Sequence, residues 1–268
     1  MKNGGIIGVP NLPTLSATSG VWGLREQLRA QRDGIWPNDS PASLFESGDF
    51  GAFYDFSNIS TLFQDTSGTT PVTANGQSIF RVNDLSNNGN NLTAVNAPIW
   101  DSSGWAIFDG VNDYLTGNIS KTITDFTIVV GSQETTRQNS ILYSLVSGLP
   151  NPGRLSAHIP WSNGTYYFDT YNTTTGQGRI QGAATVSTGT SVVTSHSRSG
   201  STVSIRTNGS TFGSGSVSNS ISANVIQLGA DLYYHNGKIS SFFFIDRALS
   251  ASDLQSVEDW MANKNGAY

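Results

Sequence analysis

The chain has 268 residues, of which only 12% are charged, and its formal net charge at pH 7 is −5. The acidic balance excludes an overall basic surface for nucleic acid, no apolar run is long enough to span a membrane, and the lack of cysteine excludes disulfides and thiolate metal sites. Ser, Thr, Asn and Gly make up roughly 43% of the chain, while aromatic residues make up 10%. This combination favours folded β structure with polar turns.

The first 37 residues are predicted to form an arm and a docking helix. Residues 1–19 contain Gly, Pro and short apolar residues without a period, which predicts an extended segment. Residues 20–33 predict a helix with an apolar stripe and arginines along one flank. Tryptophan and arginine are enriched in binding hot spots, so we expect this helix to dock onto a partner; the alternative is a helix packed on its own domain. The expected docking residues are Val21, Trp22, Leu24, Arg25, Leu28, Arg29 and Trp36.

After a predicted linker over residues 38–50, the chain is expected to form many short strands up to about residue 246. Apolar blocks recur about a dozen residues apart, and no crossover helix lies between them, so the sheets should be antiparallel and packed as a sandwich. The expected strands are Trp105–Asp109, Phe126–Gly131, Ser140–Val146, Leu155–Ile159, Thr165–Tyr171, Ser191–His196, Val203–Thr207, Val225–Leu228 and Lys238–Ile245.

Three local patterns refine this prediction. The pair Asn208-Gly209 is typical of a tight hairpin turn. The unbroken run of residues 242–245 (FFFI) indicates a central strand buried on both faces. Ser250, followed three residues later by Asp253, is typical of a helix start, and the apolar stripe after it predicts a C-terminal helix on an edge or end of the sandwich.

The sequence therefore predicts a mainly β protein. Its fold class is an antiparallel β-sandwich with an N-terminal extended arm, a short helix after the arm, and a C-terminal helix. The expected division is an arm and docking helix over residues 1–37, a linker over 38–50 and a sandwich domain over 51–268.

A family resemblance supports the same architecture. Residues 20–37 (GVWGLREQLRAQRDGIWP) resemble a short module of phage virion structural proteins. About residues 51–268 resemble the laminin G-like, concanavalin A-like jelly-roll domain of phage tail and surface proteins, which implies a jelly-roll sandwich. The segments that carry this second resemblance, in order, are residues 51–77, 83–94, 108–115, 154–169, 203–210 and 238–266.

Catalysis is not expected. The fold also occurs in β-glucanases, and sugar hydrolysis needs two carboxylates that flank the scissile bond. Glu26 and Glu258 fall on predicted helices, Glu46 falls in the linker, and Glu134 stands alone in a loop. The three histidines are far apart in the sequence and give no Ser/His/Asp arrangement. We therefore predict that the chain is not an enzyme.

Exposed aromatic rings beside polar side chains are typical of sugar-binding sites, because the ring stacks on the sugar and polar groups bond its hydroxyls. The alternatives are that the tryptophan of the PWSNG turn is a structural plug, that one ring of the adjacent tyrosine pair points inward, and that Tyr166 belongs to the core. The expected glycan-binding residues are Trp161, Tyr166, Tyr233, Tyr234 and Asn236.

A calcium site is also a hypothesis, because the resemblance implies that relatives of this fold sometimes bind calcium near Asp/Asn-rich loops. Calcium takes six to eight oxygen ligands, and two loops could supply part of that set if the fold brings them together. The alternative is that these side chains cap their own turns. The candidate ligands are Asp84, Asn87, Asn90, Asp109 and Asp113; no other cofactor is expected.

The resemblance and the lack of a recognisable secretory leader predict a phage virion structural protein, made in the host cytoplasm and carried on a tail, tail fibre or other particle surface. Its N-terminal segment would bind other virion proteins, and a homo-oligomer is expected because virion sites repeat by symmetry. The sandwich would display a lectin-like surface toward host glycans. The alternatives are a capsid decoration protein without a ligand and a free carbohydrate-binding module.

Overall fold

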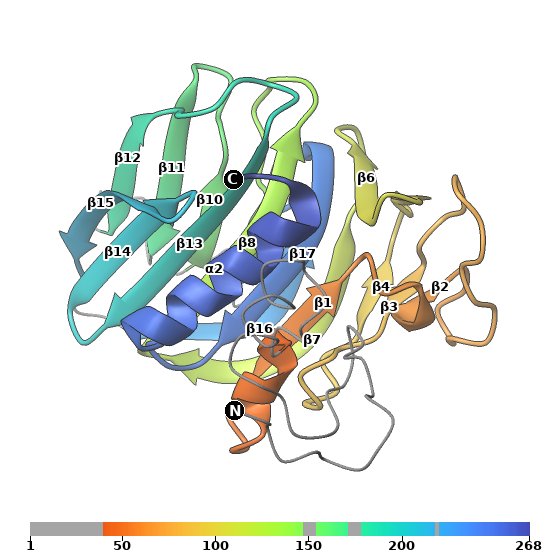
Figure 1. Cartoon of the computed structure of the whole chain (residues 1–268), viewed down its shortest axis with the longest axis horizontal. Coiled ribbons are helices and arrows are strands. Elements are labelled where there is room, and N and C mark those ends of the chain that lie inside the picture. Colours follow the sequence, from red (N-terminus) through yellow and green to blue (C-terminus); the bar gives the residue numbers. More distant parts are fainter. Residues whose placement is uncertain (1–39, 147–153, 171–177, 218–219) are drawn as a thin grey trace, which may run out of the picture.

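The computed structural model describes residues 40–146, 154–170, 178–217 and 220–268, and in these ranges the chain folds into two antiparallel sheets packed face to face (Figure 1). The spatial order of one sheet is β15 (Ser210–Ser216), β14 (Thr202–Thr207), β13 (Ser191–Ser199), β8 (Phe126–Glu134), β17 (Asn236–Ile245), β6 (Trp105–Asp109) and β5 (Ile99–Asp101), with β1 (Gly51–Asp55) paired to β17. The order of the other is β12 (Arg179–Ala183), β11 (Thr165–Thr170), β10 (Arg154–His158), β9 (Tyr143–Val146), β16 (Ile221–Leu228), β7 (Leu115–Ile123), β4 (Leu92–Ala94), β3 (Arg81–Val82) and β2 (Leu62–Phe63). We call them the eight-stranded and the nine-stranded sheet. The predicted antiparallel β-sandwich is confirmed.

The strand β17 lies at the centre of the eight-stranded sheet, as the FFFI run predicts. It pairs with β8, β6 and β1, and its residues from Ile239 to Ile245 are all buried. Alternation sends Phe242 and Phe244 into the core between the sheets, while Phe243 and Ile245 face the opposite side, where the C-terminal helix packs. A strand buried on both faces needs apolar residues at every position.

The hairpin predicted at Asn208-Gly209 is confirmed, because these two residues connect β14 and β15. Both have positive φ, 48° for Asn208 and 70° for Gly209, which is the backbone that a two-residue primed turn requires. The short strands β1 to β5, the long strand β7 and the edge strand β12 were not among the expected strands, and they add to both sheets.

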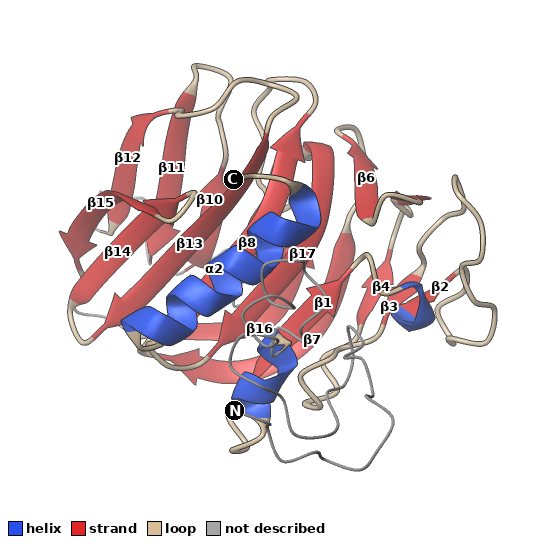
Figure 2. Ribbon diagram, in the orientation of Figure 1, coloured by secondary structure: helices blue, strands red, loops and turns tan. Residues whose placement is uncertain are grey.

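The C-terminal helix α2 (Ala251–Asn265) begins where the sequence predicts. The backbone N–H of Asp253 donates to the side chain of Ser250 at 3.1 Å, and Gly266 ends the helix in the left-handed conformation. However, α2 does not lie at an edge or end of the sandwich. It crosses the outer face of the eight-stranded sheet over β13, β8 and β17 (Figure 2), because that face carries apolar residues that the helix buries.

The N-terminal predictions lie outside the described residues: the arm, the helix and all seven docking residues. Within the range predicted as a linker, Pro41–Phe45 form a short 3-10 helix, η1, capped by Ser40. Phe45 is buried, and its ring lies 5.3 Å from the ring of Phe243. A second 3-10 turn, η2 (Ile59–Thr61), precedes β2. The domain boundaries stay predictions.

None of the helices among the described residues is long and apolar enough to cross a membrane.

Candidate functional site

The outer face of the nine-stranded sheet carries a group of polar and aromatic side chains that alternate with core residues. On β10, Leu155 and Ala157 point into the core, so Arg154 and His158 point outward. The same alternation on β11 and β12 places three more side chains outside, and pairing brings them next to β10. The strand partners are His158 with Tyr167, Ser156 with Asp169, and Asp169 with Arg179.

Trp161 lies in the hairpin loop between β10 and β11. Its backbone N–H donates to the carbonyl of Thr165, and its carbonyl accepts from the N–H of Gly164, both at 2.8 Å. Asn163 in the same loop donates from Nδ2 to the Tyr167 hydroxyl at 2.9 Å. The tight loop therefore fixes the indole ring and one neighbouring phenol on the same face.

Tyr233 reaches this face from the loop between β16 and β17. Its ring stands at 89° to the Trp161 ring with centroids 5.0 Å apart, and Trp161 also meets His158 at 5.0 Å and Tyr167 at 6.5 Å. Edge-to-face contacts of this kind hold aromatic rings in fixed orientations. Tyr233 is 42% exposed, so part of its ring is open to solvent.

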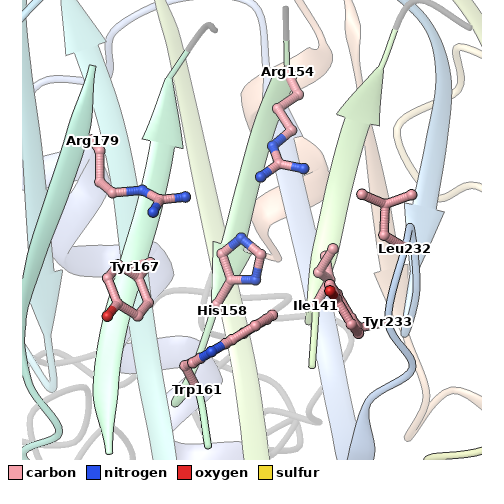
Figure 3. A pocket seen from close by; sticks show the side chains of 8 residues that line it. All are labelled: Ile141, Arg154, His158, Trp161, Tyr167, Arg179, Leu232 and Tyr233. Carbon is pink, nitrogen blue, oxygen red and sulfur yellow. The ribbon is translucent and has the colours of Figure 1, made fainter. Parts of the chain in front are cut away.

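These side chains surround a pocket of about 220 Å³, which we call the outer-face pocket. Figure 3 shows His158 at its centre, with Arg154 on one side and Trp161 on the other; Arg179 and Tyr167 come from the β11 and β12 side, and Tyr233 lies opposite. Ile141 and Leu232 complete the wall, and Leu232 is 62% exposed.

Beneath the pocket, the carboxylate of Asp169 binds the basic side chains that line it. Its Oδ2 accepts from Nη2 of Arg154 and Nη2 of Arg179, both at 2.9 Å, and its Oδ1 accepts from Nε of Arg179 at 2.6 Å. His158 Nε2 lies 3.4 Å from Oδ2, while its Nδ1 lies 3.0 Å from the carbonyl of Ser140 and must donate to it. Asp169 is 0% exposed, so this network fixes the floor of the site.

The charges set the protonation of the acids in this network. Burial alone would raise the pKa of Asp169, but hydrogen bonds from His158 and Arg179 and the charge of Arg179 hold that pKa well below its usual range. Asp231, whose Oδ2 lies 3.7 Å from Nη1 of Arg154, shows the opposite balance: burial raises its pKa although Arg154 and His158 act against the shift. Asp169 is therefore an ionised anchor at neutral pH.

The structure brings two of the predicted glycan-binding residues together and places the other three elsewhere. Trp161 and Tyr233 share the outer-face pocket. Tyr166 is 0% exposed and belongs to the core between the sheets, as the alternative interpretation states. Tyr234 does not line the pocket and its ring contacts Tyr114, while Asn236 donates to the carbonyl of Asp109 at 3.0 Å. Of the two adjacent tyrosines, Tyr233 lines the pocket and Tyr234 does not.

Asp84, the first of the predicted calcium ligands, organises its own loop. Its two oxygens accept from the backbone N–H groups of Phe53, Ser86 and Asn90 at 2.9–3.0 Å and from the Ser86 hydroxyl at 2.7 Å. Asn90 donates to the carbonyl of Gly51 at 2.7 Å. Asn87 has a positive φ of 67°, as a residue in a tight turn does.

The second predicted pair behaves in the same way and lies apart from Asp84. Asp109 Oδ1 accepts from three backbone N–H groups at 2.8–3.3 Å, and Asp113 accepts from the N–H of Asp109 at 3.1 Å. Asp109 pairs with Asn236 on β17, whereas the Phe53 that Asp84 contacts pairs with Phe243, seven residues further along. Seven residues along a strand are roughly 23 Å, so the loop of Asp109 and the loop of Asp84 lie far apart.

The described residues hold no group of three or more His, Asp or Glu side chains that could bind a metal ion. The two loops therefore do not form one oxygen-rich site, and their carboxylates fit the turn-capping alternative. Calcium binding stays a prediction, which a melting curve with and without a chelator tests.

Sequence reasoning missed Arg154, His158, Tyr167, Asp169 and Arg179. For the first four of these, the signal was present in the alternation of RLSAH and TYYFDT, in which Leu155, Ala157, Tyr166 and Phe168 are apolar or aromatic and the residues between them face outward. The register that brings the outward residues together was not readable, because it depends on how the loop around Trp161 closes.

Comparison with known proteins places the fold. No protein-family model matches the chain, and a search of curated protein sequences gave no match. Solved structures do match. An arabinofuranosidase complexed with arabinofuranosyl-alpha-1,2-xylobiose has a TM-score of 0.59 at 14% identity, covering 84% of this chain and 65% of that one.

Domain 4 of AbnA, an extracellular arabinanase from Geobacillus stearothermophilus, solved with arabinotriose, has a TM-score of 0.52 at 15% identity, covering 77% of this chain and 97% of that one. The binding domain of botulinum neurotoxin serotype D has a TM-score of 0.52 at 12% identity, covering 68% of this chain and 51% of that one. At these identities the likeness shows the fold alone: the protein is a jelly-roll β-sandwich.

Proposed function

We propose that the chain binds carbohydrate in the outer-face pocket. The observation that carries the proposal is the convergence of three aromatic rings, Trp161, Tyr167 and Tyr233, with the basic side chains of the same pocket. A sugar ring has an apolar face of C–H groups, which packs on aromatic rings, and hydroxyls, which need directed hydrogen-bond partners. A volume of about 220 Å³ is small and suits one sugar unit with its neighbours outside.

The fixed geometry of the pocket supports binding by a preformed site. The loop hydrogen bonds of Trp161, the Asn163 contact to Tyr167 and the buried network around Asp169 hold the side chains in place before any ligand arrives. A preformed site loses less conformational entropy on binding. Among similar folds, domain 4 of AbnA was solved with arabinotriose, which agrees with a sugar-binding use of this sandwich.

We propose binding without catalysis. A glycoside hydrolase needs two carboxyl groups at the scissile bond. No carboxylate is among the described residues that line the pocket, and the nearby Asp169 is fully buried with both oxygens engaged by arginine. Release of reducing sugar by the purified protein from any polysaccharide that it binds would contradict this part of the proposal.

The resemblance of residues 20–37 to a phage virion module supports a setting for this activity: a sandwich displayed on a virion appendage and docked through its N-terminal segment, in several copies. Deletion of residues 1–37 tests it, because the truncated protein should fold but fail to enter particles. Full incorporation would contradict it. A copy number in the hundreds per particle would instead favour the capsid decoration alternative.

A glycan array tests the binding proposal directly. The wild-type protein should bind a subset of glycans, and Trp161→Ala should lose that binding because it removes the central ring of the aromatic group. Tyr268→Ala is a matched control, since Tyr268 is an aromatic residue that is 53% exposed beside α2, on the other side of the sandwich. Equal binding by Trp161→Ala and the wild type, or no glycan bound by the wild type, would contradict the proposal.

A further inference from the structure

The charged groups at the outer-face pocket are arranged by depth. Asp169 is 0% exposed, whereas the side chain of Arg154 is 17% exposed and that of Arg179 is 35% exposed. Two guanidinium groups and the His158 ring line the pocket, and neither Asp169 nor Asp231 is among its lining residues. A ligand that enters therefore meets hydrogen-bond donors and positive charge, with the negative charge behind them.

Both oxygens of Asp169 are buried and already accept hydrogen bonds from arginine. Three arginine N–H groups donate to it, and His158 faces it as well. The arginines do keep unused donors. Within the described part of the chain, Arg179 hydrogen-bonds through Nε and Nη2 alone, and both of these go to Asp169. An arginine side chain has five N–H donors, so the two on Nη1 remain for a ligand.

Arg154 shows the same surplus. Among the residues that the structure describes, its buried Nε has no hydrogen-bond partner, and its Nη1 lies 3.7 Å from Asp231, beyond hydrogen-bond distance. A buried donor without a partner is costly, and a ligand oxygen that reaches this nitrogen would relieve that cost. The two arginines thus present donors that the protein itself leaves unused.

The surplus donors lie next to the aromatic rings. The Arg179 guanidinium lies over the Tyr167 ring at 4.9 Å, and His158, below both arginines in Figure 3, contacts Trp161. The contact with Tyr167 keeps the guanidinium plane at the wall of the pocket. A sugar that packs on Trp161 and Tyr233 would therefore hold a ring substituent against the guanidinium groups.

We propose that the sugar bound in the outer-face pocket carries an anionic group, a carboxylate or a sulfate ester, which Arg154 and Arg179 bind. Planar guanidinium groups match both oxyanions, and charge-assisted hydrogen bonds are stronger than those to neutral hydroxyls. This inference rests on the proposed carbohydrate binding, but it goes further by stating the chemical class of the ligand.

Isothermal titration with matched pairs of probes tests the inference. One pair is an oligogalacturonate and its methyl ester; the other is a sulfated galactan oligosaccharide and its desulfated form. The acidic member of at least one pair should bind about tenfold or more tightly than its neutral partner, and the preferred pair tells carboxylate from sulfate. Raising the salt concentration should weaken the acidic member selectively.

Variants assign the preference to the pocket. Arg179→Gln should remove the preference for the acidic probe, and Arg179→Lys should retain part of it because the charge stays. Arg81→Gln is the control, since Arg81 lies on β3 near the opposite end of the same sheet and bonds to Asn83 and the carbonyl of Thr66. Circular dichroism melting curves show that each variant is folded.

The outcomes separate the two proposals. If neutral glycans bind at the pocket as tightly as acidic ones, or if Arg179→Gln keeps the preference, the anionic inference is wrong and the carbohydrate proposal stands. If neither acidic nor neutral glycans bind, the carbohydrate proposal fails and the inference fails with it.

Discussion

The two outer faces of the sandwich differ in what covers them. On the eight-stranded sheet, α2 buries an apolar layer that includes Phe53, Val129, Phe243 and Trp260. On the nine-stranded sheet, the strands β10 to β12 carry polar and aromatic residues outward, and they line an open pocket. The same alternation of side chains thus closes one face and equips the other for contact with a ligand.

Each outer face also has a buried carboxylate that binds arginine. Glu258 on α2 is 1% exposed and accepts from Ser195 at 2.6 Å and from Nε of Arg206 at 3.0–3.1 Å, and Arg206 also bonds to Gln255 of the helix. That network joins the helix to the strands below it. Asp169 instead fixes two arginines that face a pocket. Both networks are buried carboxylates paired with arginine. Under the helix the pair holds two elements together, and under the pocket it positions side chains that a ligand can reach.

The largest expected effect is on the free energy of unfolding, which should depend strongly on the apolar face and only weakly on the pocket. Phe243→Ala removes a fully buried ring between Phe45, Phe53 and α2, so it should lower the free energy of unfolding by about 3–5 kcal/mol. Trp161→Ala should lower it by about 1 kcal/mol or less, because part of that ring is exposed. Urea denaturation of both variants measures the difference. Equal losses of unfolding free energy in the two variants would contradict the distinction between the two faces.

A smaller effect is expected from the two buried carboxylates. Asp169→Asn and Glu258→Gln each leave arginine beside a neutral group, so each should lower the free energy of unfolding by about 3 kcal/mol. Their effect on ligand affinity should differ: Asp169→Asn releases Arg154 and Arg179 and should weaken binding, whereas Glu258→Gln should leave it unchanged. Loss of binding in Glu258→Gln, with the protein still folded, would contradict the separation of roles.

The last expected effect is a dependence of stability on pH, and it arises between the two sheets. His196 on β13 lies between the sheets, hydrogen-bonded to the Tyr143 hydroxyl at 3.1 Å and to the Thr170 hydroxyl at 2.6 Å. Burial lowers its pKa to about 3, although Asp169 acts against the shift. As the pH falls below about 6.5, His196 is protonated in the unfolded chain but not in the folded chain. Its contribution to stability is therefore fully present above that pH and is lost progressively as the pH drops toward 3.

The slope should be about 1.4 kcal/mol per pH unit for His196, with a second contribution from His235, whose pKa burial lowers to about 4. His196→Gln should be less stable at neutral pH but should show a shallower loss between pH 6 and pH 4. Chemical denaturation at several pH values measures this. A variant slope as steep as that of the wild type would contradict the account.

The sequence allowed good predictions where the signal is local. The turn at Asn208-Gly209 needs positive φ, the Ser250 cap needs a hydroxyl, and the FFFI run needs burial on both sides; each is a property of a few adjacent residues. The strand β7 was missed because LTGNISKTI alternates weakly and contains glycine and asparagine in its middle.

The site was only partly predictable for the same physical reason. Trp161 and Tyr233 were identified one at a time from their local composition, but their ring contact joins loops about seventy residues apart. The ion pairs of Asp169 with Arg154 and Arg179 depend on the register of three strands. Local patterns do not specify such register, so the pocket emerges only in the folded chain.

The most direct test of the central claim is a nitrogen-15 NMR titration with the tightest-binding glycan from the array. The indole N–H signals of Trp161 and Trp260, assigned by Trp161→Phe and Trp260→Phe, report the two outer faces separately. Binding at the outer-face pocket predicts a shift of the Trp161 signal during the titration while the Trp260 signal stays in place. A shift of the Trp260 signal with the Trp161 signal unmoved would contradict the account.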